Sequence, residues 1–289
     1  MSDLVVDPSA LETAATDVSN CASRLMALEL TSYAGLEGTS STFGELAGNF
    51  KGATADMSVV AATADERIST SLANLSGAVA AFSELVVDAK DTTVETDSKS
   101  AGEISSAVPY PHARRRSEAS RRSPPPDAVV GAVRPMPPSY NEVTSWKPEV
   151  MAQIAFGVVR LQAHLEVEAP KAGNPILNLT SAQWHGEARG AADNRAEGVT
   201  RWIRNTADEF GDLAEVLQTG ATNIRNAITA LESRTTLADS RGYILDRGSR
   251  GYAINFDPAR APEGAEYDAG EAYEHHSALS TSPRRPTTR

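Results

Sequence analysis

Disulfide bonds are the first feature that this sequence excludes. The 289-residue chain has one cysteine, Cys21, so no disulfide can form within it. Aromatic residues make up only 6% of the chain, whereas hydrophobic residues make up 40%, with alanine prominent among them. Such a composition is typical of long helices that approach one another closely. We therefore expect a helical protein, with Cys21 as a small residue on the apolar face of its first helix.

Targeting and membrane segments are also missing from the sequence pattern. The N-terminus lacks the basic region and apolar stretch of a Sec-type signal peptide. No uninterrupted run of about 18 apolar residues occurs, so the sequence predicts no transmembrane span. If the protein leaves the cytoplasm, we expect it to use a route other than Sec.

Basic residues are scarce at the start of the chain. Residues 1–100 carry 5 basic and 15 acidic side chains, a net charge of −10 compared with −11 for the whole chain. Such a surface repels phosphate groups. The charge pattern therefore argues against nucleic acid as a partner.

The common signatures of catalysis are absent as well. The sequence has no Gly-x-Ser-x-Gly elbow, no phosphate-binding loop and no zinc-ligand spacing. Glu274, His275 and His276 could hold a metal ion, but we expect them to belong to a polar tail. We therefore predict no enzymatic activity, no catalytic residue, no metal site and no cofactor.

Two apolar stripes predict a helical hairpin in residues 1–97. Asp7 is a suitable N-cap, and Pro8 suits the first position of a helix. Apolar residues then recur at steps of three and four over residues 11–28 and again over 57–86. Two such helices joined by a loop should fold back as an antiparallel pair.

Residues 98–141 differ in composition from the rest of the chain. Between Pro109 and Pro138 lie eight prolines and six arginines. Proline at this density prevents regular structure, so we predict a disordered or polyproline-like linker. Its basic patch consists of Arg114, Arg115, Arg116, Arg121 and Arg122. The patch could dock on an acidic surface or on anionic lipid, but we favour a solvated linker that like charges keep extended.

A second hairpin is predicted over residues 142–239. Its first helix should begin near Pro148 and stop at Pro170. Its second helix should extend from about residue 182 to about residue 238, with glycines that could bend it. This second helix is too long for the first to cover, so part of it must pack on the first hairpin or on a separate protein.

Residues 240–289 are predicted to form a short β-like segment and a disordered tail. Apolar runs at 243–245 and 252–256 flank a turn with two glycines, which favours a small β-hairpin. From Pro258 onward we expect disorder. The predicted fold is therefore all-α, with two antiparallel helical hairpins that could form a four-helix bundle.

A Trp-x-Gly sequence, Trp184-His185-Gly186, separates the two helices of the second hairpin. Glycine permits a tight loop at a helix start, and tryptophan offers a large flat surface with one N–H donor. This order resembles the WXG family of small helical proteins that actinobacterial type VII (ESX-type) secretion systems export. In that family the turn is half of a bipartite export signal, which the resemblance implies for Trp184 and Gly186. Alternatively, Trp184 simply closes the end of the hairpin.

The other half of the family's signal is a Tyr-x-x-x-Asp/Glu motif near the end of the second helix. Tyr267 and Glu271 match this spacing, although they lie well beyond the predicted helix. Tyr33 and Glu37 match it too, but in the loop of the first hairpin. The resemblance therefore implies Tyr267 and Glu271 as the remaining signal residues.

The opening of the chain carries a further resemblance. Residues 4–6 (Leu-Val-Val), followed by Asp7, Pro8 and an alanine-rich helix, look like the start of the EspC-like (excreted virulence factor) family of type VII secretion targets. This resemblance covers roughly residues 1–100. That family's tyrosine-bearing motif would lie near residues 93–97, where this chain has Asp97 but no tyrosine.

Together these resemblances imply a virulence-associated, non-enzymatic substrate or effector of a type VII secretion system, or a partner of one. They imply contact with the secretion ATPase or a specific chaperone, and a helical heterodimer partner or a homo-oligomer. The protein would be cytoplasmic before export and secreted or envelope-associated afterwards. One alternative is a trafficking module for a separately encoded hydrolase or toxin. Trp146-Lys147-Pro148 resembles the Trp, acidic residue and Pro at the start of such modules, with lysine in place of the acidic residue. The other alternative is a cytoplasmic adaptor or chaperone for type VII substrates.

Overall fold

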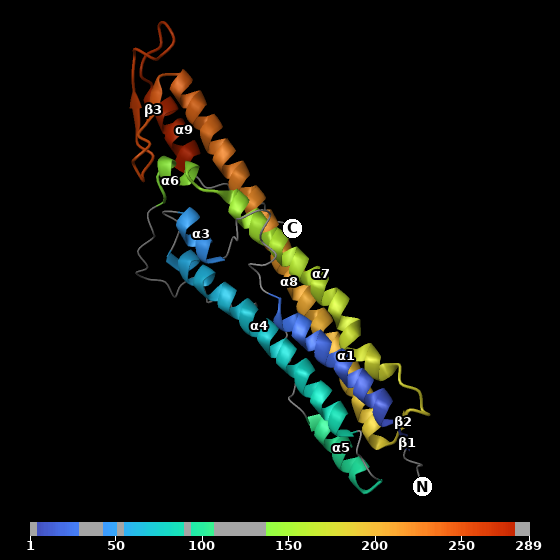
Figure 1. Cartoon of the computed structure of the whole chain (residues 1–289). Coiled ribbons are helices and arrows are strands. Elements are labelled where there is room, and N and C mark those ends of the chain that lie inside the picture. Colours follow the sequence, from blue (N-terminus) through green and yellow to red (C-terminus); the bar gives the residue numbers. More distant parts are fainter. Residues whose placement is uncertain (1–4, 29–42, 51–54, 90–93, 107–136, 281–289) are drawn as a thin grey trace. The chain divides into compact units, whose positions relative to one another are not determined.

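The computed structural model describes residues 5–28, 43–50, 55–89, 94–106 and 137–280. In these ranges the chain is mostly helical, with eight helices and four short strands (Figure 1). The chain forms two compact units, each assembled from three stretches. The first unit comprises Met1–Ser40, Asp65–Val130 and Phe156–Ala214, and the second comprises Ser41–Ala64, Gly131–Ala155 and Glu215–Arg289. The division of the chain into four consecutive segments, 1–97, 98–141, 142–239 and 240–289, remains a prediction.

Helix α1 (Pro8–Met26) begins where the sequence predicts. The carboxylate of Asp7 accepts hydrogen bonds from the N–H groups of Ser9 and Ala10, at 3.0 and 3.2 Å. These bonds satisfy backbone donors that have no partner within the helix. The residues of its buried stripe are Leu11, Ala14, Ala15, Val18, Cys21, Ala22 and Leu25. The predicted helix start, with Asp7 as the cap and Pro8 as the first residue, is confirmed.

Helix α4 (Ala55–Asp88) confirms the predicted second helix. Its residues from Asp65 onward belong to the first unit, where Leu75, Val79 and Phe82 are buried. The hydroxyl of Ser83 donates a hydrogen bond to the carbonyl of Ala15 at 2.8 Å, which joins α4 to α1.

The prediction that the chain has no segment able to span a membrane is wrong. The 26-residue stretch Thr63–Asp88 of α4 is long and apolar enough to do so by length and composition. Serine, threonine and glycine interrupt its apolar runs, so the stretch contains no uninterrupted apolar run of about 18 residues. In the first unit its larger apolar side chains are buried against protein. The partners that the resemblances imply gain no support from the structure.

Helix α5 (Val94–Ser106) overlaps the predicted linker. Its Ile104 is only 1% exposed. The linker assignment is therefore wrong for residues 98–106, because this stretch contains no proline and Ile104 anchors it.

Helix α7 (Pro148–Leu177) continues through the predicted break, with Pro170 and Pro175 inside it. The predicted stop at Pro170 is therefore wrong. A proline inside a helix costs about 3 kcal/mol. The apolar stripe nevertheless continues past it, because Ala169, Ala172 and Ile176 are all fully buried. Burial of this stripe offsets the cost that local sequence rules assign to the proline.

Helix α8 (Glu187–Ser240) extends over 54 residues and confirms the predicted long helix. In the first unit α8 packs closely on α7. A Cβ atom added at Gly173 would lie 2.3 Å from the hydroxyl oxygen of Thr200 and 2.8 Å from the carbonyl oxygen of Ala196. Only glycine permits so close an approach of the two helices.

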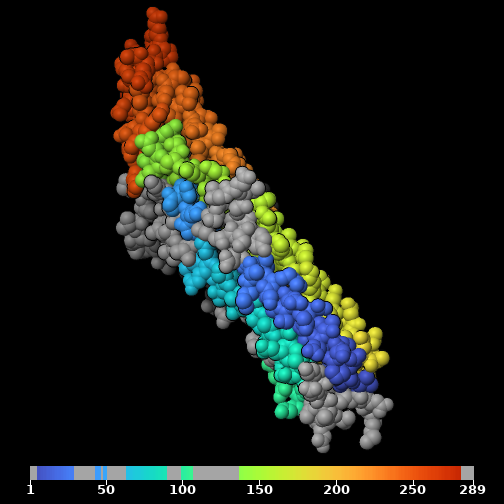
Figure 2. All heavy atoms as spheres, in the orientation of Figure 1, coloured from blue at the N-terminus to red at the C-terminus, as the bar shows by residue number. Residues whose placement is uncertain are grey.

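Helix α1 lies beside α7 in the same unit (Figures 1 and 2). The Sγ atom of Cys21 contacts the carbonyl oxygen of Glu168 at 3.5 Å, and the Arg24 guanidinium binds the Glu168 carboxylate at 2.8 Å. Cys21 is fully buried, which confirms its predicted place on the apolar face.

The second unit contains short helices and strands together with the first turns of α4 and α7 and the last turns of α8. Helices α3 (Phe43–Asn49) and α6 (Tyr140–Thr144) belong to it. Strands β3 (Tyr243–Leu245) and β4 (Ile254–Phe256) pair antiparallel, with Tyr243 opposite Phe256. The predicted small β-hairpin is confirmed.

Helix α9 (Ala269–Ser280) lies where the sequence predicts a disordered tail, so that prediction is wrong for these residues. The carboxylate of Asp268 accepts hydrogen bonds from the N–H groups of Gly270 and Glu271, at 2.6 and 3.0 Å. Leu279 is buried with Leu245 of β3. A helix cap and one apolar anchor thus hold a segment whose polar composition suggested disorder.

Candidate functional site

The Trp-x-Gly turn lies at the junction of α7 and α8 in the first unit. Trp184 and His185 form strand β2, and Gly186 comes directly before the first residue of α8. The φ angle of Gly186 is 147°. An L-residue with a side chain rarely adopts this conformation, so glycine is required for the chain to turn into α8 here.

Strand β2 pairs antiparallel with β1 (Val5–Val6) at the start of the chain. Val5 lies opposite His185, and Val6 lies opposite Trp184. The N–H group of Asp7 also donates a hydrogen bond to the carbonyl of Gln183 at 2.7 Å. The two motifs that resemble two different secretion families therefore meet in one two-stranded ladder.

Trp184 itself is buried, with 1% of its surface exposed. Among the described residues its indole N–H has no hydrogen-bond acceptor. His185 is the exposed side chain of the turn. The corner therefore offers its backbone turn and His185 to solvent, while the indole supports it from inside.

The guanidinium of Arg189 holds this corner together. Its Cζ atom lies 5.9 Å from the centroid of the Trp184 ring. Its Nη1 and Nη2 atoms donate hydrogen bonds to the carbonyls of Leu179 and Leu177, at 2.9 and 3.4 Å. Leu177 is the last residue of α7, so Arg189 satisfies a carbonyl that has no partner within that helix, together with the Leu179 carbonyl of the following loop.

An ion pair orients Arg189. Its Nε atom binds the carboxylate of Asp193 at 2.8 Å, one turn further along α8. The sequence does not single out Arg189, because Arg and Asp at this spacing indicate only an ordinary pair on a helix surface. Its place three residues after Gly186 is the signal that could have linked it to the turn.

The Tyr-x-x-x-Glu motif belongs to the second unit. Tyr267 is 60% exposed, and its ring centroid lies 6.4 Å from that of Tyr243 and 6.0 Å from that of Phe256. Glu271 lies in the first turn of α9, where it accepts a hydrogen bond from the Tyr243 hydroxyl at 3.3 Å. Both motif residues thus gather around Tyr243, whose role the sequence did not reveal.

Glu271 is also paired with Arg241. The hydrogen bond from Arg241 lowers the pKa of Glu271, and partial desolvation opposes this effect only in part. The Nε2 atom of His275 lies 3.8 Å from the same carboxylate. Glu271 therefore fastens α9 to the end of α8 as a charged group.

A buried carboxylate, Glu168, lies between two cations in the first unit. It is 5% exposed and accepts hydrogen bonds from Arg24 and Lys171, both at 2.8 Å. Burial raises its pKa, but the hydrogen bonds and positive charges of Lys171 and Arg24 together lower it further, so the pKa of Glu168 lies below its usual range. Burial raises the pKa of the neighbouring Cys21 thiol to about 12, with the Glu168 charge adding to the effect.

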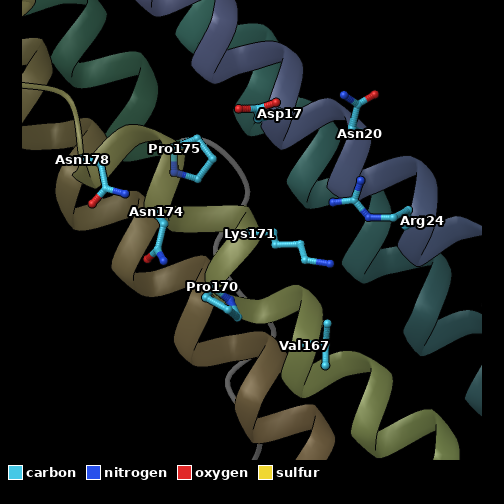
Figure 3. Close-up of a pocket in the computed structure, with 9 residues that line it drawn as sticks. All are labelled: Asp17, Asn20, Arg24, Val167, Pro170, Lys171, Asn174, Pro175 and Asn178. Atoms are coloured by element: carbon cyan, nitrogen blue, oxygen red, sulfur yellow. The ribbon is translucent and has the colours of Figure 1, made fainter.

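An open hollow of about 440 Å³ lies between α1 and α7 beside this ion pair (Figure 3). The side chains of Arg24 and Lys171 project into the space between the two helices. Its lining consists of Asp17, Asn20, Arg24, Val167, Pro170, Lys171, Asn174, Pro175 and Asn178. These residues, all in the described part of the chain, include no serine, cysteine or histidine that could act as a nucleophile or general base.

Two further predictions concern the basic patch and metal binding. The patch at Arg114, Arg115, Arg116, Arg121 and Arg122 lies outside the described residues. Within the described ranges no group of three His, Cys, Asp or Glu side chains could hold a metal ion.

No family model matches the chain, and no curated protein or solved structure matches it either. The resemblance to type VII secretion targets therefore rests on the chain's own motifs. Of these, the Trp-x-Gly corner and the strand opposite it have the most defined geometry.

Proposed function

We propose that this protein is a non-enzymatic substrate of a type VII (ESX-type) secretion system. The observation that carries the proposal is the corner at Trp184 and Gly186, which connects two long helices as the Trp-x-Gly turn does in the family it resembles. The φ angle of Gly186 and the contacts of Arg189 support a built turn at this place.

We also propose that α1, α4, α7 and α8 pack in the first unit as a four-helix bundle made of two hairpins from one chain. Three contacts support this arrangement. Ser83 joins α4 to α1, Arg24 and Glu168 join α1 to α7, and Gly173 brings α7 against α8. Such a bundle would reproduce within one chain the packing of two small secreted hairpins.

The electrostatics of the first unit support a role without catalysis. The Glu168 carboxylate is already bound by Arg24 and Lys171, so it is a poor general base. The pKa of Cys21, about 12, keeps its thiol neutral, and only a thiolate is a strong nucleophile. Both groups therefore serve packing.

Secretion is tested by comparing culture filtrate with cell lysate, in cells with and without an active secretion ATPase. We expect the protein in the filtrate only when the ATPase is active. A protein that stays in the lysate in both strains would overturn the proposal and favour the cytoplasmic adaptor. Release that does not depend on the ATPase would overturn it as well.

The corner is tested by comparing Trp184→Phe with Trp202→Phe. Both residues belong to the first unit, and phenylalanine at position 184 loses no hydrogen bond because the indole N–H has no acceptor among the described residues. We expect Trp184→Phe to lower the ratio of secreted to cellular protein about tenfold, because the smaller ring supports the turn less well from inside. Trp202→Phe should leave this ratio unchanged, and circular dichroism should show equal helicity. Equal secretion of both variants would show that Trp184 only fills the core.

A further inference from the structure

We infer that the export element is composite, with strand β1 completing the Trp-x-Gly corner. The inference rests on the proposed secretion function and adds Val5 and Asp7, through their backbone N–H groups, to the element that export requires. Those residues are positioning residues, because they act through the turn that they pair with.

The register of the ladder separates the two faces of this element. The N–H of Asp7 donates to the carbonyl of Gln183, which places these two residues at a hydrogen-bonded position of the ladder, while the N–H of Gln183 donates to Thr180. Such pairs alternate along an antiparallel ladder with pairs that are not hydrogen-bonded. Val6 and Trp184 therefore form a pair of the second kind, and the Val6 N–H points away from β2. The N–H of Val5, one residue earlier, points toward β2.

Side chains of opposite residues share one face of the ladder. Val6 and Trp184 share the inner face, where the indole is 1% exposed. Val5 and His185 share the outer face, where His185 is exposed. Detaching β1 would therefore uncover the indole and free the backbone of the turn.

Asp7 couples this ladder to α1. Its N–H donates to the α7–α8 turn, and its carboxylate caps the N-terminus of α1. A ladder of two-residue strands is not stable in isolation. The composite element therefore forms only when the first helix has folded against the α7–α8 junction, which makes export depend on folding of the whole first unit.

Two proline variants of the full chain test this inference. Val5→Pro removes an N–H that faces β2, whereas Val6→Pro removes one that faces away. We expect Val5→Pro to lower the ratio of secreted to folded cellular protein about tenfold and Val6→Pro to change it by less than about twofold, since only the first breaks the ladder. Folded cellular protein is measured by resistance to limited proteolysis, so that a merely destabilised variant is not counted as defective in export.

A cysteine pair measures the pairing directly, whether or not the Val5→Pro variant folds. In a Cys21→Ser background, Val5→Cys with His185→Cys places two thiols on opposite residues, within reach of a disulfide. We expect rapid oxidation of this pair in the purified, folded full-length protein. A Val5→Cys and Glu187→Cys pair, which the register does not place opposite each other, should oxidise more slowly.

The outcomes separate this inference from the proposed function. If the parent protein is not exported in an ATPase-dependent way, the proposed function is wrong. If the parent is exported and Val5→Pro is exported as well as Val6→Pro, the composite element is wrong and the function stands. Equal loss in both variants, or failure of the paired cysteines to oxidise, would also overturn the composite element.

Discussion

The Trp-x-Gly corner and the Tyr-x-x-x-Glu motif, which we propose as two parts of an export signal, are built in opposite ways. Trp184 is buried at a turn made of backbone contacts: a strand pair, a glycine with a positive φ angle, and carbonyls bound by Arg189. Tyr267 is exposed and is held by ring contacts with Tyr243 and Phe256. Changes at Trp184 should therefore lower stability, whereas changes at Tyr267 should leave stability almost unchanged.

The largest effect is expected for Trp184→Ala. Removing a fully buried indole should lower the free energy of unfolding by about 3–5 kcal/mol, because the cavity cannot collapse completely. Urea denaturation followed by circular dichroism measures this loss. Trp202→Ala, at a half-buried position of α8, is the control and should cost clearly less. Equal losses of unfolding free energy for Trp184→Ala and Trp202→Ala would show that Trp184 is no more important to stability than a half-buried tryptophan.

A smaller effect is expected for Arg189→Ala. The substitution leaves the Leu177 and Leu179 carbonyls without their donor and should cost about 1.5–3 kcal/mol, the range for hydrogen bonds to charged groups. Arg189→Lys keeps the charge but loses the planar fork, so it should recover only part of the loss. Full recovery by lysine in the same urea assay would show that charge alone holds the corner.

Substitution of the buried carboxylate Glu168 should change stability more than substitution of the surface carboxylate Glu271. Both Glu168 and Glu271 have a pKa below the usual range, so each stabilises the protein above that range and loses its contribution as the pH falls through its own pKa. Glu168→Gln should cost about 1 kcal/mol at neutral pH, because it weakens two hydrogen bonds at a buried site. Its unfolding free energy should also fall less than the parent's between neutral and acidic pH. Glu271 lies on the surface, so Glu271→Gln should change the pH dependence of the unfolding free energy less. A larger change for Glu271→Gln than for Glu168→Gln would contradict the distinction between a buried and an exposed carboxylate.

The smallest effect on stability is expected for Tyr267→Ala. Its side chain is mostly exposed, so the free energy of unfolding should change by less than about 0.5 kcal/mol. If Tyr267 belongs to the export signal, the secreted fraction should still fall, as measured in filtrate and lysate. Tyr273→Ala, at another exposed tyrosine of the same unit, is the matched control. Equal secretion of the parent and both variants would remove Tyr267 and Glu271 from the proposed signal.

Local sequence patterns predicted the helices that have a clear N-cap or a regular apolar stripe. The Asp7 cap with Pro8, the stripe of α4 and the long stripe of α8 all follow from helical periodicity. The break predicted at Pro170 failed because proline acts locally, whereas the burial of Ala169, Ala172 and Ile176 depends on neighbouring helices. The membrane-length stretch in α4 was missed because its apolar character is an average over many small residues.

In the candidate site, too, some residues have a local sequence signal and others depend on tertiary packing. Its Trp and Gly could be recognised in the sequence, since a Trp-x-Gly between two helical patterns is a local signal. Arg189 and Tyr243 were not recognised, because packing selects their partners. These are the Leu177 and Leu179 carbonyls for Arg189, and the Tyr267 ring and Glu271 for Tyr243.

By itself, the sequence determined the start of α1, the helices α4 and α8 and the glycine before α8, because those features depend on neighbours three or four residues away. It did not determine α5, α9 or the continuation of α7 past Pro170. Only the tertiary structure decided that the first strand of the chain pairs with the Trp-x-Gly turn and that the indole lies inside. Backbone pairing between distant residues carries no side-chain signature, and burial depends on what the rest of the fold places around a residue.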